Sequence, residues 1–232
     1  DTMRLAQMRD LIAGQSWFDT TQPRMNAPFG LTMHWPHYVD AAIAVLALLL
    51  RPLFGGHSEL AALWLWPVLT ALPVFLATTR LGARLAGFEG GILALVLTAT
   101  SFAVLGNFAP GHIDHHNVQL ALCLWMAVCL TEVERPWFFA AAAPLGALSL
   151  AIGLETLPYV LTGSLVAVWF LTIGEPQLDS AVRRFGLLFA GSAAVLFVIA
   201  PVSERIAASC DAYSAFYAPL AVAGGIGLSA LT

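Results

Sequence analysis

The chain has 232 residues, of which 59% are hydrophobic and 10% are charged, and its mean hydropathy is +0.81. So few charged residues cannot cover the surface of a soluble domain of this size. The composition therefore excludes a soluble globular domain and predicts an all-α polytopic membrane protein. The formal net charge is −4 and all ten basic residues are arginines, so the sequence predicts no polybasic patch for nucleic acid.

Residues 1–40 are the polar part of the chain. Apolar residues at helical spacing predict a short amphipathic helix over 3–13 that ends near Gly14. Prolines and glycines then predict irregular backbone, and the aromatic residues among them suit a membrane interface. We therefore expect a structured extramembrane loop. Because the chain opens on Asp1 in polar sequence, we also expect these residues to be a fragment of a longer protein.

The next segment, 41–57, differs from the rest of the apolar sequence. Its apolar run covers only about ten residues before Arg51 and Pro52, which is short for a membrane span and predicts an interfacial or re-entrant helix. Residues 58–232 predict a helical bundle of about seven spans. The apolar runs are 61–77, 91–107, 117–130, 137–152, 157–173, 185–202 and 218–232.

The arginines predict the orientation of the bundle. Five of the ten arginines lie in three short loops, 78–89, 131–136 and 174–184, whereas the alternate loops hold only Arg205. Basic residues in short loops mark the cytoplasmic side, so the alternate loops, 108–116 among them, are expected on the external side. If 41–57 does not cross the membrane, residues 1–40 share that external side.

Chemically active side chains gather in GHIDHHNVQL, residues 111–120. Asp114 and His116 can converge on one divalent metal in extended or turn backbone. Asp1 and His34 of the first loop would complete a mixed O/N set that suits Mn²⁺ or Zn²⁺, and Mg²⁺ less well. From spacing alone an alternative stays open, in which each histidine caps a helix or lies at the interface and Asp114 is an N-terminal cap.

Two further acidic residues lie at predicted external helix ends. Glu155, in AIGLETLPYVL, is costly in so apolar a stretch unless it is paired or functional. It is a candidate general base or extra metal ligand, and a structurally paired carboxylate is the alternative. Asp211, in SCDAYSAFY, has aromatic neighbours that could contact a sugar or form an interfacial belt.

Five stretches carry a resemblance to a known family: DTMRLAQMRDL (1–11), WFD (17–19), NAPFG (26–30), MHWPHYVD (33–40) and GHIDHH (111–116). In order and spacing they resemble the catalytic subunit of oligosaccharyltransferases, especially archaeal single-subunit forms, within the GT-C class of membrane glycosyltransferases. The resemblance covers roughly 1–120. Over 121–232 only hydrophobicity and topology agree.

The resemblance implies a GT-C-like transmembrane bundle with a structured first external loop. It also implies metal ligands at Asp1, His34, Asp114 and His116, where the metal holds the diphosphate of a polyprenyl-linked sugar donor. Neutralising the charge of that leaving group is what glycosyl transfer from a lipid phosphate requires. A carboxylate, Asp1 or Glu155, would then activate the acceptor.

Other residues are expected around the substrate: Arg4, Arg24, His37, His115 and Asp211. Guanidinium groups match phosphate geometry, although each arginine could equally be a solvated loop charge. The 232 residues contain no W-W-D-Y-G motif, with which that family reads its acceptor, so we expect a lipid or glycan acceptor rather than a protein. The expected location is a prokaryotic inner membrane, among its lipids, with the active loops on the periplasmic side.

Two other function classes stay open. A non-catalytic subunit derived from the same fold would bind other membrane subunits and no metal. A transporter is less favoured, because the polar residues cluster in external loops and, apart from Glu155, not within the helices.

Overall fold

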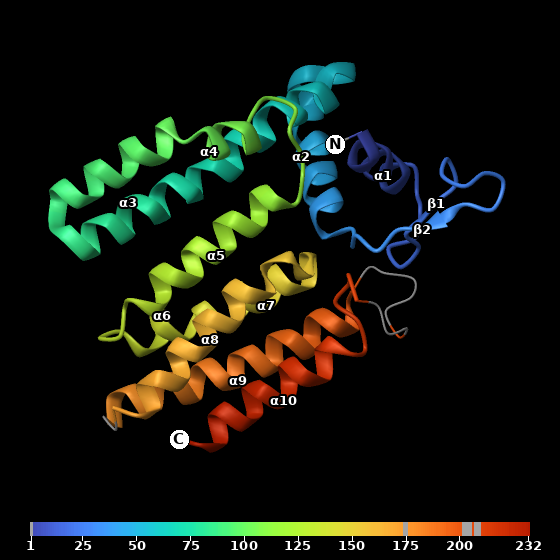
Figure 1. Ribbon diagram of the computed structural model, residues 1–232. Helices are drawn as coiled ribbons and strands as arrows, with labels where there is room; N and C mark the ends of the chain where they lie inside the picture. The colour runs from blue at the N-terminus through green and yellow to red at the C-terminus, as the bar shows by residue number, and fades with distance from the viewer. Residues whose placement is uncertain (1, 174–175, 201–205, 207–209) are drawn as a thin grey trace.

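The computed structural model describes residues 2–173, 176–200, 206 and 210–232 (Figure 1). This part of the chain is mostly helical, with loops between the helices and one short β-hairpin. The helices are α1 (Thr2–Ile12), α2 (Tyr38–Phe54), α3 (Ser58–Thr100), α4 (Phe102–Asn107), α5 (His116–Leu130), α6 (Pro136–Ala140), α7 (Ala142–Ile152), α8 (Leu157–Leu171), α9 (Pro176–Val198) and α10 (Tyr217–Ala230). Two 3₁₀ turns, η1 (Gly55–His57) and η2 (Leu154–Thr156), precede α3 and α8, and the hairpin pairs β1 (Thr21–Gln22) with β2 (Leu31–Thr32).

The helices have the length and surface of an all-α membrane protein. Three stretches of the described chain are long and apolar enough to cross a membrane: Tyr38–Thr100, Leu154–Leu171 and Leu178–Val198. Shorter apolar stretches accompany them: His116–Leu130, Pro136–Ile152 and Tyr217–Ala230. Many large apolar side chains, such as Leu85, Phe88 and Phe102, are largely exposed, which suits contact with lipid rather than with water.

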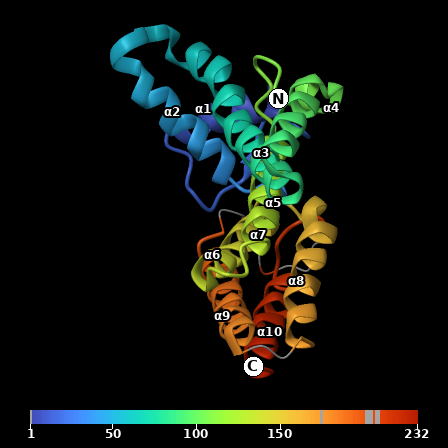
Figure 2. The same cartoon turned by 90° about the vertical axis from the view of Figure 1, so that its left-hand side faces the viewer.

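The bundle is a stack of neighbouring helices. α5 packs between α3 and α7, and α9 packs between α7 and α10. Figure 2 shows this stack from its side, with α2 and α3 at one end and α8, α9 and α10 at the other. Fully buried small residues such as Ala142, Ala143 and Ala181 let the helices approach closely around Phe139 and Phe185.

Helix α3 is two antiparallel arms, 58–85 and 88–100, rather than one rod. The chain reverses where Ala86 leaves helical geometry and Gly87 adopts φ +68°. Beside this turn the two arms are in close contact at glycines. A Cβ atom added to Gly90 would lie only 2.5 Å from the carbonyl oxygen of Gly82.

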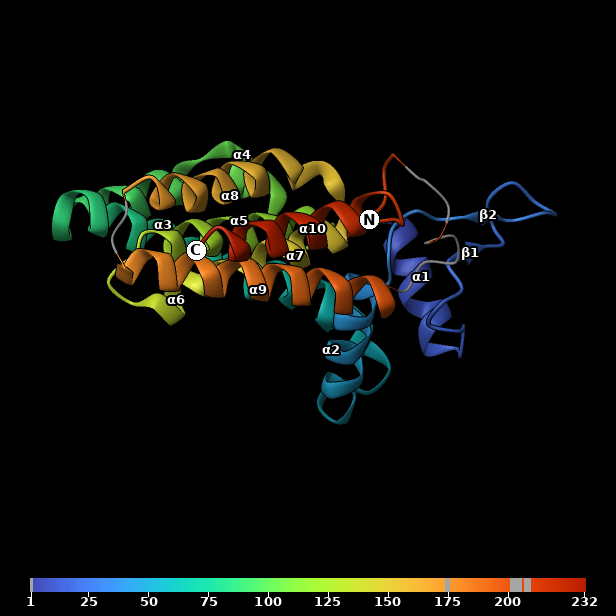
Figure 3. The same cartoon turned by 90° about the horizontal axis from the view of Figure 1, so that it is seen from below.

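The N-terminal region begins with the helix that the sequence predicts. α1 confirms the expected helix over 3–13, and it packs against α2. α2 and η1 form a separate element that runs across the direction of the other helices (Figures 1 and 3). That this element lies along a membrane surface stays a prediction.

Polar residues separate to the two ends of the bundle. At one end Arg80 pairs with Glu132, Arg84 donates to the Thr131 carbonyl oxygen, and the Arg184 guanidinium lies 4.5 Å from the Trp137 ring centroid. The histidine-bearing loop before α5 and the folded N-terminal region lie at the other end (Figures 1 and 3). The assignment of these ends to the cytoplasmic and external sides stays a prediction.

Candidate metal centre

The loop before α5 holds its polar residues in place through one apolar anchor. Gly111 adopts φ +82° and its N–H donates to the Leu63 carbonyl oxygen at 3.2 Å, which ties the loop to α3. Ile113 is 1% exposed and lies in the same buried cluster as Trp66. The chain therefore enters α5 with its next three side chains directed together.

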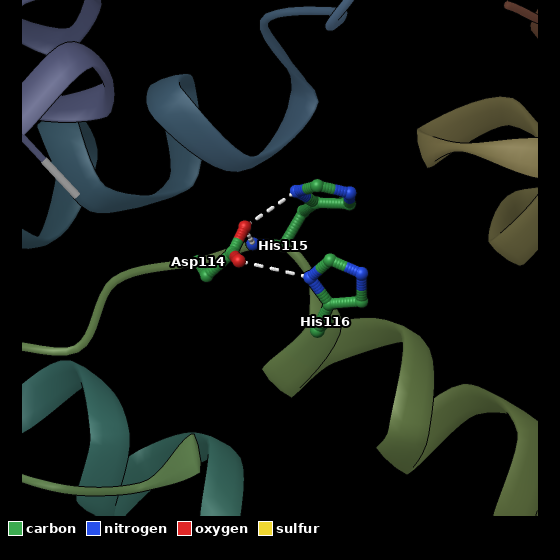
Figure 4. A group of neighbouring side chains, drawn as sticks. All are labelled: Asp114, His115 and His116. Atoms are coloured by element: carbon green, nitrogen blue, oxygen red, sulfur yellow. Dashed lines mark hydrogen bonds and ion pairs between the residues drawn. The ribbon is translucent and has the colours of Figure 1, made fainter. Parts of the chain in front are cut away.

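These three side chains are Asp114, His115 and His116, and each offers one possible ligand atom within 4.8 Å of the others. Figure 4 shows both imidazole rings turned toward the Asp114 carboxylate. Nδ1 of His116 lies 2.8 Å from one carboxylate oxygen, and Nδ1 of His115 lies 2.6 Å from the other in an ion-pair contact. The rings themselves are close, with centroids 4.3 Å apart.

Glu155 joins this group from η2. Its Oε1 lies 3.2 Å from Nε2 of His115, so His115 bridges two carboxylates that are 41 positions apart in the sequence. Gln119, which is buried, donates to Oε2 of Glu155 at 3.3 Å and to the Gly153 carbonyl oxygen at 2.9 Å. The carboxylate of Glu155 is thus held by residues of α5.

The charges in the loop stabilise one another. Burial disfavours the Asp114 carboxylate, but the hydrogen bonds and attraction from His115 and His116 outweigh burial and hold the pKa of Asp114 far below its usual range. Burial likewise opposes the charged His115 ring, but its bonds to Asp114 and Glu155 prevail and raise the pKa of His115. Asp114 is therefore an anion at any physiological pH.

Residues of the first loop reach this site through Trp35. Its ring centroid lies 6.0 Å from that of His115 and 5.2 Å from that of His34, and the Arg4 guanidinium lies 5.5 Å from it on another side. Residues 1–40 and 111–116 therefore meet in the structure, and that both face the external side of a membrane stays a prediction.

The structure does not bring His34 into the metal group. Its Nε2 lies 3.2 Å from Oδ2 of Asp211, so a predicted ligand and a predicted substrate residue pair with each other. The group that forms contains His115 in place of His34, because His115 is adjacent in the chain and buried beside Asp114. Asp1, predicted as a ligand and as a catalytic residue, lies outside the described residues.

Three residues expected at the substrate are already engaged within the protein. Arg4 is 2% exposed and its Nη1 donates to Oδ1 of Asp40 at 3.0 Å. His37 is fully buried, with its ring nitrogens 3.2 Å from Oδ2 of Asp40 and 3.0 Å from the Asp19 carbonyl oxygen. Arg24 forms a two-pronged pair with Asp10 at 2.6 and 3.0 Å. All three thus have partners within the N-terminal region, and their contact with a substrate stays a prediction.

A groove leads away from the Asp114 loop between α5 and α8. Its volume is about 830 Å³, which is within the range of ligand-binding pockets. Polar residues line one end, among them His116, Gln119, Glu155 and Thr156. The rest of the lining is mostly apolar and follows α5 from Leu120 as far as Leu130, so the groove joins a charged site to an apolar channel about 15 Å long at 1.5 Å per helical residue.

Gln119 is the site residue that the sequence interpretation missed. It lies inside an apolar run, NVQLALCL, and the only available signal was a polar side chain at a helical position that apolar residues surround. Ser149 and Thr156 were missed for the same reason. Their hydroxyl oxygens lie 2.8 Å apart beside the groove.

A divalent metal fits these residues. Two imidazoles and one carboxylate form the donor set of open zinc sites, in which a water or substrate takes the remaining position. Their ligand atoms lie within 4.8 Å of one another, and bonds of about 2.0–2.2 Å place the ligands of a tetrahedral zinc roughly 3.4 Å apart, so small side-chain movements would bring all three onto one ion. The imidazoles favour Zn²⁺, Mn²⁺ remains compatible, and Mg²⁺ fits least because it prefers oxygen ligands.

Comparisons with protein-family models, with characterised proteins and with solved structures give no match to this chain. The function is therefore inferred from the chemistry of the site and from the resemblance in the sequence.

Proposed function

We propose that this protein is a membrane glycosyltransferase of the GT-C type, in a prokaryotic inner membrane, that takes a sugar from a polyprenyl-phosphate or -diphosphate donor at the external face. The groove between α5 and α8 is the observation that carries the proposal. Its charged end lies beside Asp114, and its apolar length suits an isoprenoid chain. A lipid-linked sugar phosphate needs both in one continuous site.

The charges at this end support a role for a divalent metal. Asp114 and Glu155 place two carboxylates where the donor phosphate would lie, and alone they would repel it. A divalent ion on Asp114, His115 and His116 would reverse that sign and neutralise the leaving phosphate. The first turns of α5 and of η2 with α8 also line this end, and helix N-termini favour anions.

The residues of the chain then have distinct tasks. Gln119 holds Glu155 beside the charged end of the groove, where its Oε atoms can accept the proton of an acceptor hydroxyl. The acceptor oxygen forms a bond to the sugar carbon C1 while the C1–O bond to phosphate breaks. The phosphate leaves with the bonding electron pair, and Glu155 holds the proton.

The test uses membranes of cells that express the protein, supplied with a polyprenyl-phosphate or -diphosphate donor that carries a radiolabelled sugar. Wild type should move label from the donor to an acid-stable product. Asp114→Ala should lower the rate by more than the roughly 10- to 100-fold that follows removal of a residue behind a metal ligand. His57→Ala is the matched control, because His57 lies in η1, is exposed and does not belong to the group.

The outcomes separate the parts of the proposal. Label that stays on both donors with wild-type membranes would refute the glycosyltransferase. Equal transfer by Asp114→Ala and wild type would refute the metal-assisted reaction. Elemental analysis should find one Zn or Mn per chain in wild type and His57→Ala, and little in Asp114→Ala.

A further inference from the structure

A second groove lies on the opposite side of α8. It has a volume of about 410 Å³ and is enclosed by α7 to α10. Its lining follows α8 from Leu157 to Val168 and α10 from Tyr217 to Leu228, which is about 16 Å on each wall. That length matches one leaflet of a bilayer, half of the roughly 30 Å hydrocarbon core.

The two grooves open on either side of one short turn. Leu154 and Leu157 line the second groove, whereas Glu155 and Thr156 line the first. Residues three apart eclipse in a 3₁₀ turn, so η2 directs its apolar pair to one side and its polar pair to the other. A chain in the second groove would therefore have its head beside Glu155.

The lining of the second groove carries no ionisable acid, base or imidazole among the described residues. Its polar groups are Ser164 and two tyrosines, and the Tyr213 hydroxyl already donates to the Ala193 carbonyl oxygen at 2.9 Å. The first groove ends at carboxylates and imidazoles suited to a phosphate and its cation. The second suits a hydrocarbon chain with an uncharged head.

We propose that the second groove holds the chain of the acceptor, so that the acceptor is itself a membrane lipid that presents a hydroxyl group. This inference rests on the proposed glycosyltransferase function. It makes α8 the partition between two lipids, with Glu155 at the end where their heads meet. The hydroxyl of the acceptor lipid loses its proton to Glu155 as its oxygen bonds to the sugar, and the donor phosphate departs.

The structure provides a matched pair of variants for the test. Gly224 and Gly227 both lie in α10, and a side chain added at either meets nothing within 4 Å, but only Gly224 lines the second groove. Gly224→Leu fills the groove and Gly227→Leu does not. Both substitutions raise helix propensity equally, so a difference in activity between the two variants reports the filling of the second groove.

The assay supplies expressing-cell membranes with the radiolabelled polyprenyl donor and extracts the product after mild acid, which cleaves sugar phosphates and spares glycosides. We expect the acid-stable label in the organic phase, lowered roughly tenfold or more in Gly224→Leu and unchanged in Gly227→Leu. Binding of a fluorescent polyprenyl phosphate, which reports the first groove, should be equal in both variants.

Other results would overturn the inference in distinguishable ways. Acid-stable label on protein or in the aqueous phase, or organic-phase label that Gly224→Leu does not lower, refutes the acceptor groove and leaves the glycosyltransferase standing. Failure of wild type to move label from the donor refutes both.

Discussion

Replacing Arg4 by Met should loosen the N-terminal region without touching the metal group. Arg4 and Asp40 form a buried ion pair, with side chains 3% and 0% exposed. Methionine keeps most of the side-chain volume and removes the charge. Asp40 then stays buried with His37 as its remaining partner among the contacts seen here.

The magnitude follows from the buried carboxylate that is left behind. Breaking a buried ion pair by removing one partner costs about 3–5 kcal/mol, and the contact from His37 places this case near the lower end. Because the pair joins α1 to α2, the loss should appear as local opening of α1. Amide exchange in α1 should become faster by roughly two to three orders of magnitude.

The assay is hydrogen exchange of the detergent-solubilised protein, read by peptide mass for α1 and, as an internal standard, for α7. The double variant Arg4→Met/Asp40→Leu is the control, because apolar replacement of a whole buried pair is often neutral or stabilising. Exchange in α1 that stays at the wild-type rate in Arg4→Met, together with lost binding of a polyprenyl phosphate, would refute this reasoning and return Arg4 to the substrate site.

Three further predictions concern other parts of the fold. Burial lowers the pKa of His37, but its hydrogen bonds to Asp40 and to the Asp19 carbonyl outweigh burial and raise the pKa above 6.5. The stabilisation from the charged ring is therefore full below pH 6.5 and is lost as the pH rises through the raised pKa. Protease cleavage of residues 1–37 should accelerate as the pH rises above 6.5 in wild type and not in His37→Asn. Gly82→Ala should separate the arms of α3 and cost about 1–3 kcal/mol in thermal unfolding, whereas Gly56→Ala, which meets open space, should not. Gly153→Ala should displace the Glu155 carboxylate and lower sugar transfer while leaving the melting temperature near that of wild type, and equal transfer rates would contradict the assigned role of Glu155.

Most of the helices were predictable from the sequence because the bilayer restricts the choices. All seven apolar runs of the sequence contain helix, and the polar first region forms the expected short helix at 2–12. The sequence predicted the reversal within α3 as a loop at 78–89 between two apolar runs, but its extent was wrong, because only Ala86 and Gly87 leave helical geometry and helix continues on both sides. Helix limits at such a turn depend on close packing of the two arms, which composition does not encode.

The site was predictable only where its parts are close in sequence. Asp114 and His116 were predicted together, and they meet. The role given to His34 depended on how the first loop folds, and there a contact with Asp211 formed instead. The long-range pair of His115 with Glu155 joins two helix starts, and no local pattern indicates which of three neighbouring histidines faces α8.

The order of residues in GLETLP explains why Glu155 lies between two grooves. Gly153 has φ −178°, an extended conformation that any residue can adopt, so the backbone does not require glycine here. Glycine matters at this position because it has no Cβ atom, which leaves room for the side chains of Gln119 and Glu155 to meet. The 3₁₀ turn then sorts Leu154 and Leu157 from the polar pair, before a proline in the first turn of α8 starts the regular helix. Inserting one residue into this turn would rotate the carboxylate away from His115 and place it against the apolar groove, where burial would disfavour its charge. The same six residues therefore position a carboxylate and separate two grooves.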